Sequence, residues 1–430
     1  MHTHETQMKH RNFLIGLFAG VVAIAGLLSD GLRAETGFVE QFKFSGGIVV
    51  ALDFDDGQSI ADLATDGPFV IHALLRDEGR VAAARQVIRE AGVYGKVSCN
   101  LYNGRDLPYV DGLVNLVLCN ESCEVPEAEL MRVLIPGGRV ATEGTNGWKK
   151  RAKPIPDGLD EWNQFLHGAD NNGVSLDDVG PPQRLRWHDT PEYGRSKSLS
   201  PSFTNMVSAD GVLFTIEDRA TTEDINAPVE YFLVARDGFN GIELWKRPME
   251  HWSKWQTGSI KSIPTQQQRC LAAVGRSVYI CSGFGGPVTD LAIRTGAVRQ
   301  VYQHTKQTTE FAVEGNTLYA IKGTPYKLPR AASSNGRTEL CAVSLKDGEK
   351  LWSLAIEDEY TGGTFAVKGS RLVYHSTSGL TCVDSADGNV LWTETVPIPN
   401  APPTTKEASR AKRRGQKPTD SAVFSSNIHP

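Results

Sequence analysis

The chain has 430 residues, which is enough for more than one domain with its own core. Hydrophobic residues make up 40% and charged residues 22%, a balance that excludes a largely disordered chain. The formal net charge of −5 gives no global reason to expect a nucleic acid or an anionic membrane as a partner.

The first 34 residues have the order of a secretory signal peptide. Lys9 and Arg11 precede an apolar run at 13–28, and Ala34 is a small residue at a position suited to cleavage. The run is shorter than the roughly 20 apolar residues that a spanning helix needs. An uncleaved N-terminal anchor is the alternative. In both cases we expect residues 35–430 to be extracytoplasmic, either periplasmic or secreted.

Seven cysteines do not make the dense pattern of a domain that depends on disulfides. Cys119 and Cys123 have three residues between them, but the sequence has no matching second pair for a zinc site. We expect buried thiols, or one or two disulfides, and no metal site.

Between residues 35 and 148, segments typical of strands alternate with segments typical of helices. This alternation predicts a parallel, doubly wound sheet. The expected strands are 48–52, 69–74, 97–101, 113–118 and 139–142. The expected helices start at Ser59 and cover 79–91 and 127–134, and Pro136-Gly137-Gly138 stops the last one.

Two segments of this domain resemble the class I S-adenosylmethionine-dependent methyltransferases. The stretch ELMRVLIPGG at 129–138 is similar to the helix-to-strand segment before the fifth strand of that family. The stretch LPYVD at 107–111, with the strand that follows it, resembles the family's fourth-strand region. The resemblance covers residues 46–145 and implies a Rossmann-like, methyltransferase-type fold.

The loop that would bind the cofactor departs from the family pattern. The family has alternating glycines there because the backbone approaches the methionine part closely, but this chain has Asp53 and Asp55. Each carboxylate adds a charge that repels the cofactor's own carboxylate. Leu75 stands where an acid would hold the ribose, and Asp77 lies two residues further on. If the cofactor site is retained, its binding residues are Asp53, Asp55, Gly57 and Asp77.

Asp53, Asp55 and Asp56 also permit a cation site, because hard metal ions bind clustered carboxylates. Three acids in one turn are more typical of a solvated loop. We therefore expect a pseudo-enzyme fold with no catalytic residue and no resident cofactor.

Residues 149–200 form a linker and the approach to a second domain. The linker is basic and interrupted by Pro154 and Pro156. Next, Trp162 precedes a stretch rich in Gly, Asp and Asn, and Arg186-Trp187 follows. This order resembles the leading sequence of PQQ-like (pyrroloquinoline quinone-type) β-propeller proteins. A structural role at the propeller edge is the simpler interpretation. The alternative is a site lined by Trp162, His167, Asp170 and Asn172.

Residues 201–397 contain four glycine turns of one kind. The glycines are Gly241, Gly296, Gly348 and Gly388, at spacings of 55, 52 and 40 residues. Three of them have a tryptophan four residues later, and Gln300 takes that place once. Each unit also begins with a hairpin that has glycine at its turn. A single unit cannot bury its own face, so we expect neighbours to stack with the tryptophan packed between them.

These units resemble PQQ-like repeats, the blade type shared by quinoprotein dehydrogenases and by noncatalytic scaffold propellers such as the lipoprotein of outer-membrane barrel assembly. The dehydrogenases typically carry two adjacent cysteines, which this chain lacks. Their calcium ligands and catalytic acid have no counterparts at matching positions. Four blades, with a candidate fifth at 160–200, are fewer than such repeats usually have. We expect either an early-terminated form of a longer propeller or a ring completed by a second copy.

Residues 398–430 are rich in Pro, Ser, Lys and Arg and are expected to form a flexible basic tail. The chain as a whole is predicted to be α/β followed by all-β. We expect an exported, noncatalytic binding or scaffold module whose partner is a protein or a cell-envelope ligand. No nucleic acid is expected, and a membrane contact only if the N-terminal segment is uncleaved. The alternatives are a methyltransferase that binds S-adenosylmethionine through an atypical loop, and a PQQ-dependent oxidoreductase.

Overall fold

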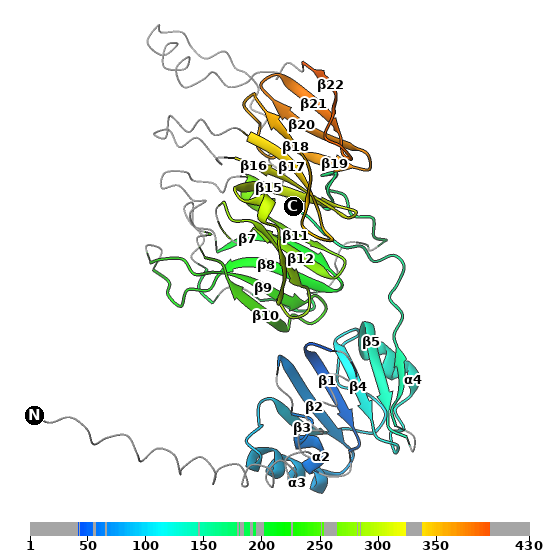
Figure 1. Ribbon diagram of the computed structural model, residues 1–430. Helices are drawn as coiled ribbons and strands as arrows, with labels where there is room; N and C mark the ends of the chain where they lie inside the picture. Colours follow the sequence, from blue (N-terminus) through cyan, green and yellow to red (C-terminus); the bar gives the residue numbers. More distant parts are fainter. Residues whose placement is uncertain are drawn as a thin grey trace, which may run out of the picture.

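The structure is a computed structural model of the chain, and it contains one mixed sheet followed by four antiparallel sheets (Figure 1). The signal peptide and the tail, predicted at 1–34 and 398–430, lie outside the residues that the structure describes. None of the helices in the described part has the length and apolar character needed to cross a bilayer. The described residues are 42, 44–54, 57–64, 67–144, 147–178, 180, 185–189, 192–194, 202–224, 227–250, 252, 265–281, 283, 285–323 and 338–395.

The first sheet has the strand order β3-β2-β1-β4-β5-β6. Strands β1 to β5 are parallel, and β6 pairs antiparallel with β5. The order reverses between β1 and β4, which is the doubly wound arrangement that the alternating pattern predicts. The strands are β1 Gly47–Leu52, β2 Phe69–Leu75, β3 Val97–Leu101, β4 Val114–Cys119, β5 Leu134–Thr142 and β6 Lys149–Ala152.

Helices cover both faces of this sheet, which is why its central strands are almost continuously apolar. In β1, Val49 and Ala51 pack on the face covered by α2 (Gly57–Ala61) and α3 (Glu78–Glu90). Val50 and Leu52 pack on the face covered by α4 (Glu127–Val133). The predicted Rossmann-like fold is confirmed by this topology.

Two details of the first domain differ from the sequence-based expectation. The basic stretch at 149–152, expected to be linker, forms β6, whose four residues are exposed. Its backbone completes the edge of β5, and such pairing needs no apolar side chain. In addition, β5 begins at Leu134 and includes Pro136-Gly137-Gly138, so the helix ends before these residues rather than at them.

The second part consists of four four-stranded antiparallel sheets, each with its strands in sequence order. The first strands of neighbouring sheets, β7, β11, β15 and β19, contact one another, so they surround a common axis as in a propeller. Blades 1 and 2 consist of β7 Phe203–Ala209, β8 Val212–Asp218, β9 Tyr231–Asp237 and β10 Glu243–Pro248, then β11 Leu271–Val274, β12 Ser277–Cys281, β13 Val288–Ala292 and β14 Val298–Val301. Blades 3 and 4 consist of β15 Thr308–Glu314, β16 Thr317–Lys322, β17 Thr338–Ser344 and β18 Lys350–Ile356, then β19 Ala366–Lys368, β20 Arg371–Ser376, β21 Gly379–Asp384 and β22 Val390–Glu394.

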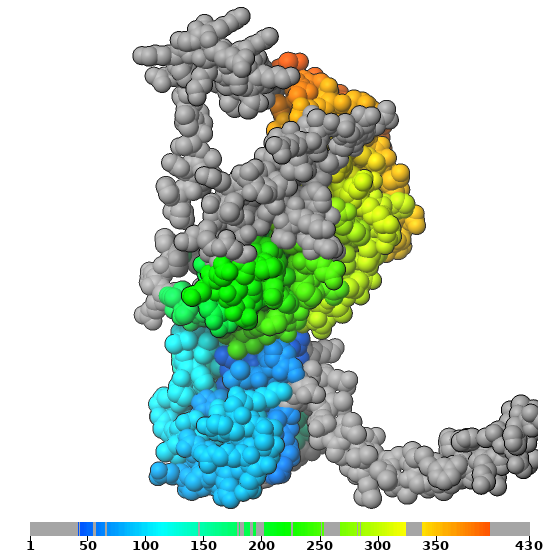
Figure 2. Space-filling model, turned by 90° about the vertical axis from the view of Figure 1, so that its left-hand side faces the viewer, coloured from blue at the N-terminus to red at the C-terminus, as the bar shows by residue number. Residues whose placement is uncertain are grey.

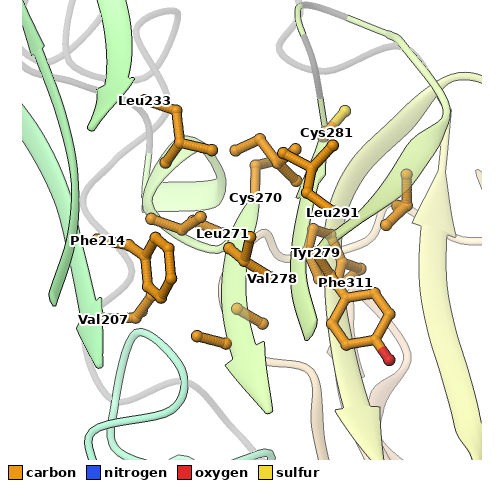
Figure 3. Packing of buried hydrophobic residues seen from close by; sticks show 14 of the residues in the cluster. Val207, Phe214, Leu233, Cys270, Leu271, Val278, Tyr279, Cys281, Leu291 and Phe311 are labelled. Atoms are coloured by element: carbon orange, nitrogen blue, oxygen red, sulfur yellow. The ribbon is translucent and has the colours of Figure 1, made fainter. Parts of the chain in front are cut away.

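Apolar side chains from adjacent blades pack together, as expected for units that cannot bury their own faces. Figure 3 shows Val207, Phe214 and Leu233 of blade 1 facing Leu271 of blade 2, and Phe311 of blade 3 beyond them. The four hairpins predicted at the start of the units are present as the first two strands of each blade. The candidate fifth blade is wrong for the described part of 160–200, where no extended strand is present.

The first domain lies against blade 1 (Figure 2). The contact is made by the amino ends of the parallel strands, where the Asn115 side chain lies over Gly47. The Asn115 amide donates to Asp237 at 2.7 Å and accepts from the Asn240 amide at 2.7 Å, and both bonds are buried. The propeller therefore covers the edge of the sheet opposite the carboxyl ends of its strands.

Candidate functional site

The carboxyl ends of β1, β2 and β4 form the edge where doubly wound sheets usually bind ligands. Asp53 comes directly after β1 and has a backbone φ of 57°, in the left-handed region that favours glycine. The backbone thus keeps a glycine-like conformation although the side chain is an aspartate. Asp53 is only 3% exposed, so the expectation of a solvated acidic loop is wrong for this residue.

The Asp53 carboxylate is held by two side chains from neighbouring strands. Arg76, immediately after β2, places its Nε 3.2 Å from Asp53 Oδ1. The hydroxyl of Tyr102, immediately after β3, donates to Asp53 Oδ2 at 2.7 Å. Asp53 also raises the pKa of Arg76, and burial together with this hydrogen bond raises the pKa of Tyr102, so the guanidinium stays charged and the phenol stays protonated.

Arg76 extends this network to the loop after β4. Its Nη1 lies 3.2 Å from the Glu124 carboxylate, and its Nη2 donates to the backbone carbonyl of Ser122 at 3.1 Å. The guanidinium therefore connects three strand ends. Asp53, Arg76 and Tyr102 thus form one network of hydrogen bonds and ion pairs at this edge.

The other predicted cofactor residues have structural roles in the described part. Asp77 is the N-cap of α3, and its carboxylate accepts from the Arg80 backbone N–H at 2.8 Å. Gly57 begins α2, where a Cβ would lie 2.8 Å from the Cα of Ala84 in α3. Its small size therefore lets the two helices approach. Asp55 and Asp56 lie outside the described residues, so a cation site that includes them stays a hypothesis.

The seven cysteines are thiols rather than disulfides, and six are buried. Cys119, at the end of β4, and Cys123 are coupled by a hydrogen bond that lowers the pKa of Cys123. Among the described residues, no group of three or more His, Cys, Asp or Glu side chains is arranged to hold a metal ion.

A segment at residues 160–173, here called the axial segment, crosses the propeller axis and contacts the first strand of every blade. Backbone carbonyls at 162, 163 and 169 accept from Ser208, Ala273 and Val367, each at 2.8 Å. In blade 3 the contact is made by the Gln164 side chain. Its amide nitrogen donates to the Val313 carbonyl at 2.9 Å, and its amide oxygen accepts from the Val313 N–H at 3.1 Å. One short segment thus joins all four blades.

The site proposed from Trp162, His167, Asp170 and Asn172 is part of this segment. The Trp162 indole donates to a backbone carbonyl of the segment itself. His167 Nε2 lies 2.6 Å from the Asp160 carboxylate, and Asp170 accepts from Lys368 Nζ at 2.9 Å. These contacts favour the structural interpretation of the segment.

A buried ionic cluster beside the axial segment has no counterpart in the sequence-based expectations. Arg269 lies over the ring of Phe165, and its Nη1 is 3.6 Å from Glu310 Oε2. Oε1 of Glu310 accepts from the Tyr360 hydroxyl at 2.7 Å and from the Gly363 N–H at 3.1 Å. Glu310 is fully buried, and burial raises its pKa. A glutamate directly before the apolar run 311–313 of β15 is the sequence signal that could have found this cluster.

The comparisons with known proteins distinguish the same two parts of the chain as the structure, the first domain and the propeller region. Residues 207–394 and 336–414, just under half of the chain, match the family model described as outer membrane protein assembly factor BamB. No curated protein matches the chain significantly.

Several solved structures are similar to parts of the chain. A putative S-adenosyl-L-methionine-dependent methyltransferase from Methanococcus maripaludis has 20% identity over 26% of this chain and 54% of its own length, with a TM-score of 0.23. Geranyl diphosphate C-methyltransferase from Streptomyces coelicolor has 20% identity over 29% of this chain and 48% of its own length, with a TM-score of 0.23. A quinohemoprotein alcohol dehydrogenase from Pseudomonas putida has 13% identity over 55% of this chain and 40% of its own length, with a TM-score of 0.33.

The chain thus spans about half or less of the length of each of these structures. The strand order of the first sheet and the four stacked antiparallel sheets carry the fold assignment. The second part of the chain is a PQQ-like β-propeller region, and it is joined to a domain with a methyltransferase-type fold.

Proposed function

We propose that this protein is a noncatalytic binding or scaffold module outside the cytoplasm, and that its methyltransferase-type domain no longer binds S-adenosylmethionine. The observation that carries the proposal is the network of Asp53, Arg76 and Tyr102 at the cofactor edge. A bound cofactor would bring its own carboxylate close to that of Asp53. Without a charge of opposite sign to spare, the site would repel it.

Arg76 does not supply that spare charge. It is already shared between Asp53 and Glu124, two carboxylates for one guanidinium. The position that would hold the ribose is Leu75, which is 2% exposed and packs in the core. The residues present therefore do not fit S-adenosylmethionine, and no methyl-transfer step is derived from them.

The propeller region also does not fit a quinone cofactor. No two cysteines are adjacent in the sequence. The Glu310 carboxylate is fully buried: its Oε1 accepts from the Tyr360 hydroxyl and the Gly363 N–H, and its Oε2 lies 3.6 Å from Arg269 Nη1. The matching family model is named for an assembly factor of the outer membrane, which supports a protein of the cell envelope as the partner.

Isothermal titration of the full chain with S-adenosylmethionine tests the proposal. We expect no saturable heat with the wild-type chain. The Asp53→Gly variant restores the family's residue at a left-handed position, so it should bind more tightly than the wild type if the carboxylate is the obstacle. Asp77→Ala, which removes only a helix cap, is the matched control and should behave like the wild type. Submillimolar binding by the wild-type chain would overturn the proposal.

A further inference from the structure

A tight turn after β4 brings two cysteines together at the carboxyl edge of the first sheet. Cys119 is the last residue of β4, and Cys123 lies four positions further along the chain. Between them, the Asn120 side chain accepts from the Ser122 N–H at 3.0 Å, and the Asn120 carbonyl accepts from the Cys123 N–H at 3.0 Å. These bonds return the chain to the end of the strand. The two thiols therefore form a hydrogen bond with each other.

The two thiols differ in their access to solvent. Cys119 is 1% exposed, because its backbone lies between Leu52 of β1 and Thr142 of β5. Cys123 is partly exposed, and the neighbouring residues Ser122 and Glu124 are exposed. A reagent in solution can therefore reach the sulfur of Cys123 but not that of Cys119.

The two thiols also differ in how readily they ionise. The hydrogen bond from Cys119 lowers the pKa of Cys123, and it outweighs the burial that acts in the opposite direction. The Val125 N–H lowers this pKa too, while the Asp53 carboxylate raises it and the Arg76 guanidinium lowers it. The same thiol–thiol bond, together with burial, raises the pKa of Cys119. Cys123 is thus the sulfur that ionises first, and a thiolate is the form that attacks disulfides.

We propose that Cys119 and Cys123 are a site of reversible disulfide formation by exchange with an external disulfide, in which Cys123 attacks and Cys119 resolves. The Cys123 thiolate bonds to one sulfur of the external disulfide, whose S–S bond breaks and releases a thiolate that takes up a proton. The Cys119 sulfur then bonds to the Cys123 sulfur and displaces the second external thiolate, which takes the Cys119 proton. The pair loses two electrons and two protons, and the external disulfide is reduced to two thiols. The inference does not depend on the proposed function.

A second pair of cysteines provides a control within the same chain. Cys270 and Cys281 lie opposite each other at the ends of β11 and β12, where the Cys281 N–H donates to the Cys270 carbonyl at 3.1 Å. Their thiols also interact, but both residues are 0% exposed inside the core of the propeller (Figure 3). The two pairs therefore share the contact between thiols and differ in access. The proposal predicts exchange at Cys119 and Cys123 alone.

The reaction can be followed on the full chain with glutathione disulfide as the probe. The reduced protein is incubated with the probe at neutral pH, unfolded with N-ethylmaleimide to block the remaining thiols, and digested with trypsin. No lysine or arginine lies between Arg105 and Arg132, so the tryptic peptide 106–132 contains both cysteines of the pair and no other. An internal disulfide makes this peptide two hydrogen atoms lighter than the dithiol and leaves it without a blocking group.

We expect the internal disulfide in peptide 106–132 to form at least roughly tenfold faster than Cys270 or Cys281 loses its thiol. Dithiothreitol should restore both thiols. Two thiols that persist in excess glutathione disulfide would overturn the proposal. A common rate for all cysteines would also overturn it, since the reaction would then follow unfolding, and so would a glutathione adduct on Cys123 that never resolves.

Three serine variants assign the two roles. Cys119→Ser lacks the resolving sulfur, so glutathione should accumulate on Cys123 as a mixed disulfide. Cys123→Ser keeps only the buried sulfur and should form no adduct. Cys99→Ser is the matched control, because Cys99 is another buried cysteine of the same sheet, and it should react like the wild type. An adduct on Cys119 in Cys123→Ser at the wild-type rate would refute the assignment. If a variant does not fold, the wild-type peptide still decides.

The Cys119→Ser variant also distinguishes the two sources of an external disulfide. It is incubated separately with glutathione disulfide and with an oxidised protein of the thioredoxin fold, and the mixed disulfides are separated by mass. A faster reaction with the protein assigns a protein oxidoreductase as the partner, and a faster reaction with glutathione disulfide assigns a small disulfide. The absence of an adduct with both would overturn the proposal.

Discussion

Replacing the glycine beside a docked tryptophan should damage the propeller more than replacing a glycine of the same conformation elsewhere. Gly388 and Gly369 belong to the same blade and have φ values of 79° and 55°. A Cβ on Gly388 would lie 2.6 Å from the Trp352 ring, whereas a Cβ on Gly369 would have no atom within 4 Å. The variants Gly388→Ala and Gly369→Ala therefore share the backbone strain and differ in the clash.

The strain of a left-handed alanine is about 1–2 kcal/mol, and it applies to both variants. The clash in Gly388→Ala adds about 1–3 kcal/mol, as for other overpacked core positions. If Trp352 leaves its place, the hydrogen bond to the Ser385 carbonyl is lost as well, at about 1 kcal/mol. We therefore expect Gly388→Ala to be destabilised by about 2–4 kcal/mol more than Gly369→Ala.

Hydrogen exchange of the backbone amides of β18 and β21 is the suitable assay, because a chain with several domains does not unfold in a single step. Gly388→Ala should accelerate exchange in both strands, and Gly369→Ala should affect them weakly. The oxidation rate of Trp352 gives an independent reading of the same contact. Equal acceleration by the two variants would show that strain alone matters and would refute the docking argument.

Three further changes test other contacts. Asn115→Asp places a carboxylate against the buried Asp237, so small-angle scattering should show the two domains separating, and an unchanged radius of gyration would contradict this contact. Tyr302→Phe removes the hydroxyl that donates to the Leu345 carbonyl, so hydrogen exchange of the propeller amides should report a loss of about 1 kcal/mol, and unchanged exchange would contradict the contribution of this bond. Asp160 has a pKa of about 2, held low chiefly by the Leu176 N–H, so its stabilisation is present above about pH 4 and is lost as pH falls towards 2. The melting-temperature difference between wild type and Asp160→Asn should shrink over that range, and a constant difference would refute this assignment.

The parts of the fold that depend on local patterns could be predicted from the sequence. Apolar runs alternating with helical segments indicated the doubly wound sheet, and the recurring glycine turns indicated the blades. Even the substitution of Gln300 for tryptophan falls at the expected junction, against Gly348. The hydrogen bond supplied there by Tyr302 was missed, because it comes from two residues beyond the repeat position.

The parts that depend on contacts between distant residues could not be predicted. The three acids of the first loop indicated a solvated turn, but Asp53 is buried by Arg76 and Tyr102, which are 23 and 49 residues away. The axial segment has no periodic pattern, because its contacts with the blades come from backbone carbonyls and from single polar side chains such as Gln164 and Asn171. The strand β6 was also missed, since basic, exposed side chains do not indicate pairing.

Equilibrium dialysis of the full chain against radiolabelled S-adenosylmethionine tests most directly the claim that the cofactor edge is closed by its own side chains. The network of Asp53, Arg76 and Tyr102 predicts equal cofactor concentrations on both sides of the membrane throughout the submillimolar range. Saturable retention of one cofactor per chain in that range would contradict the claim and would identify the domain as a functional cofactor-binding unit.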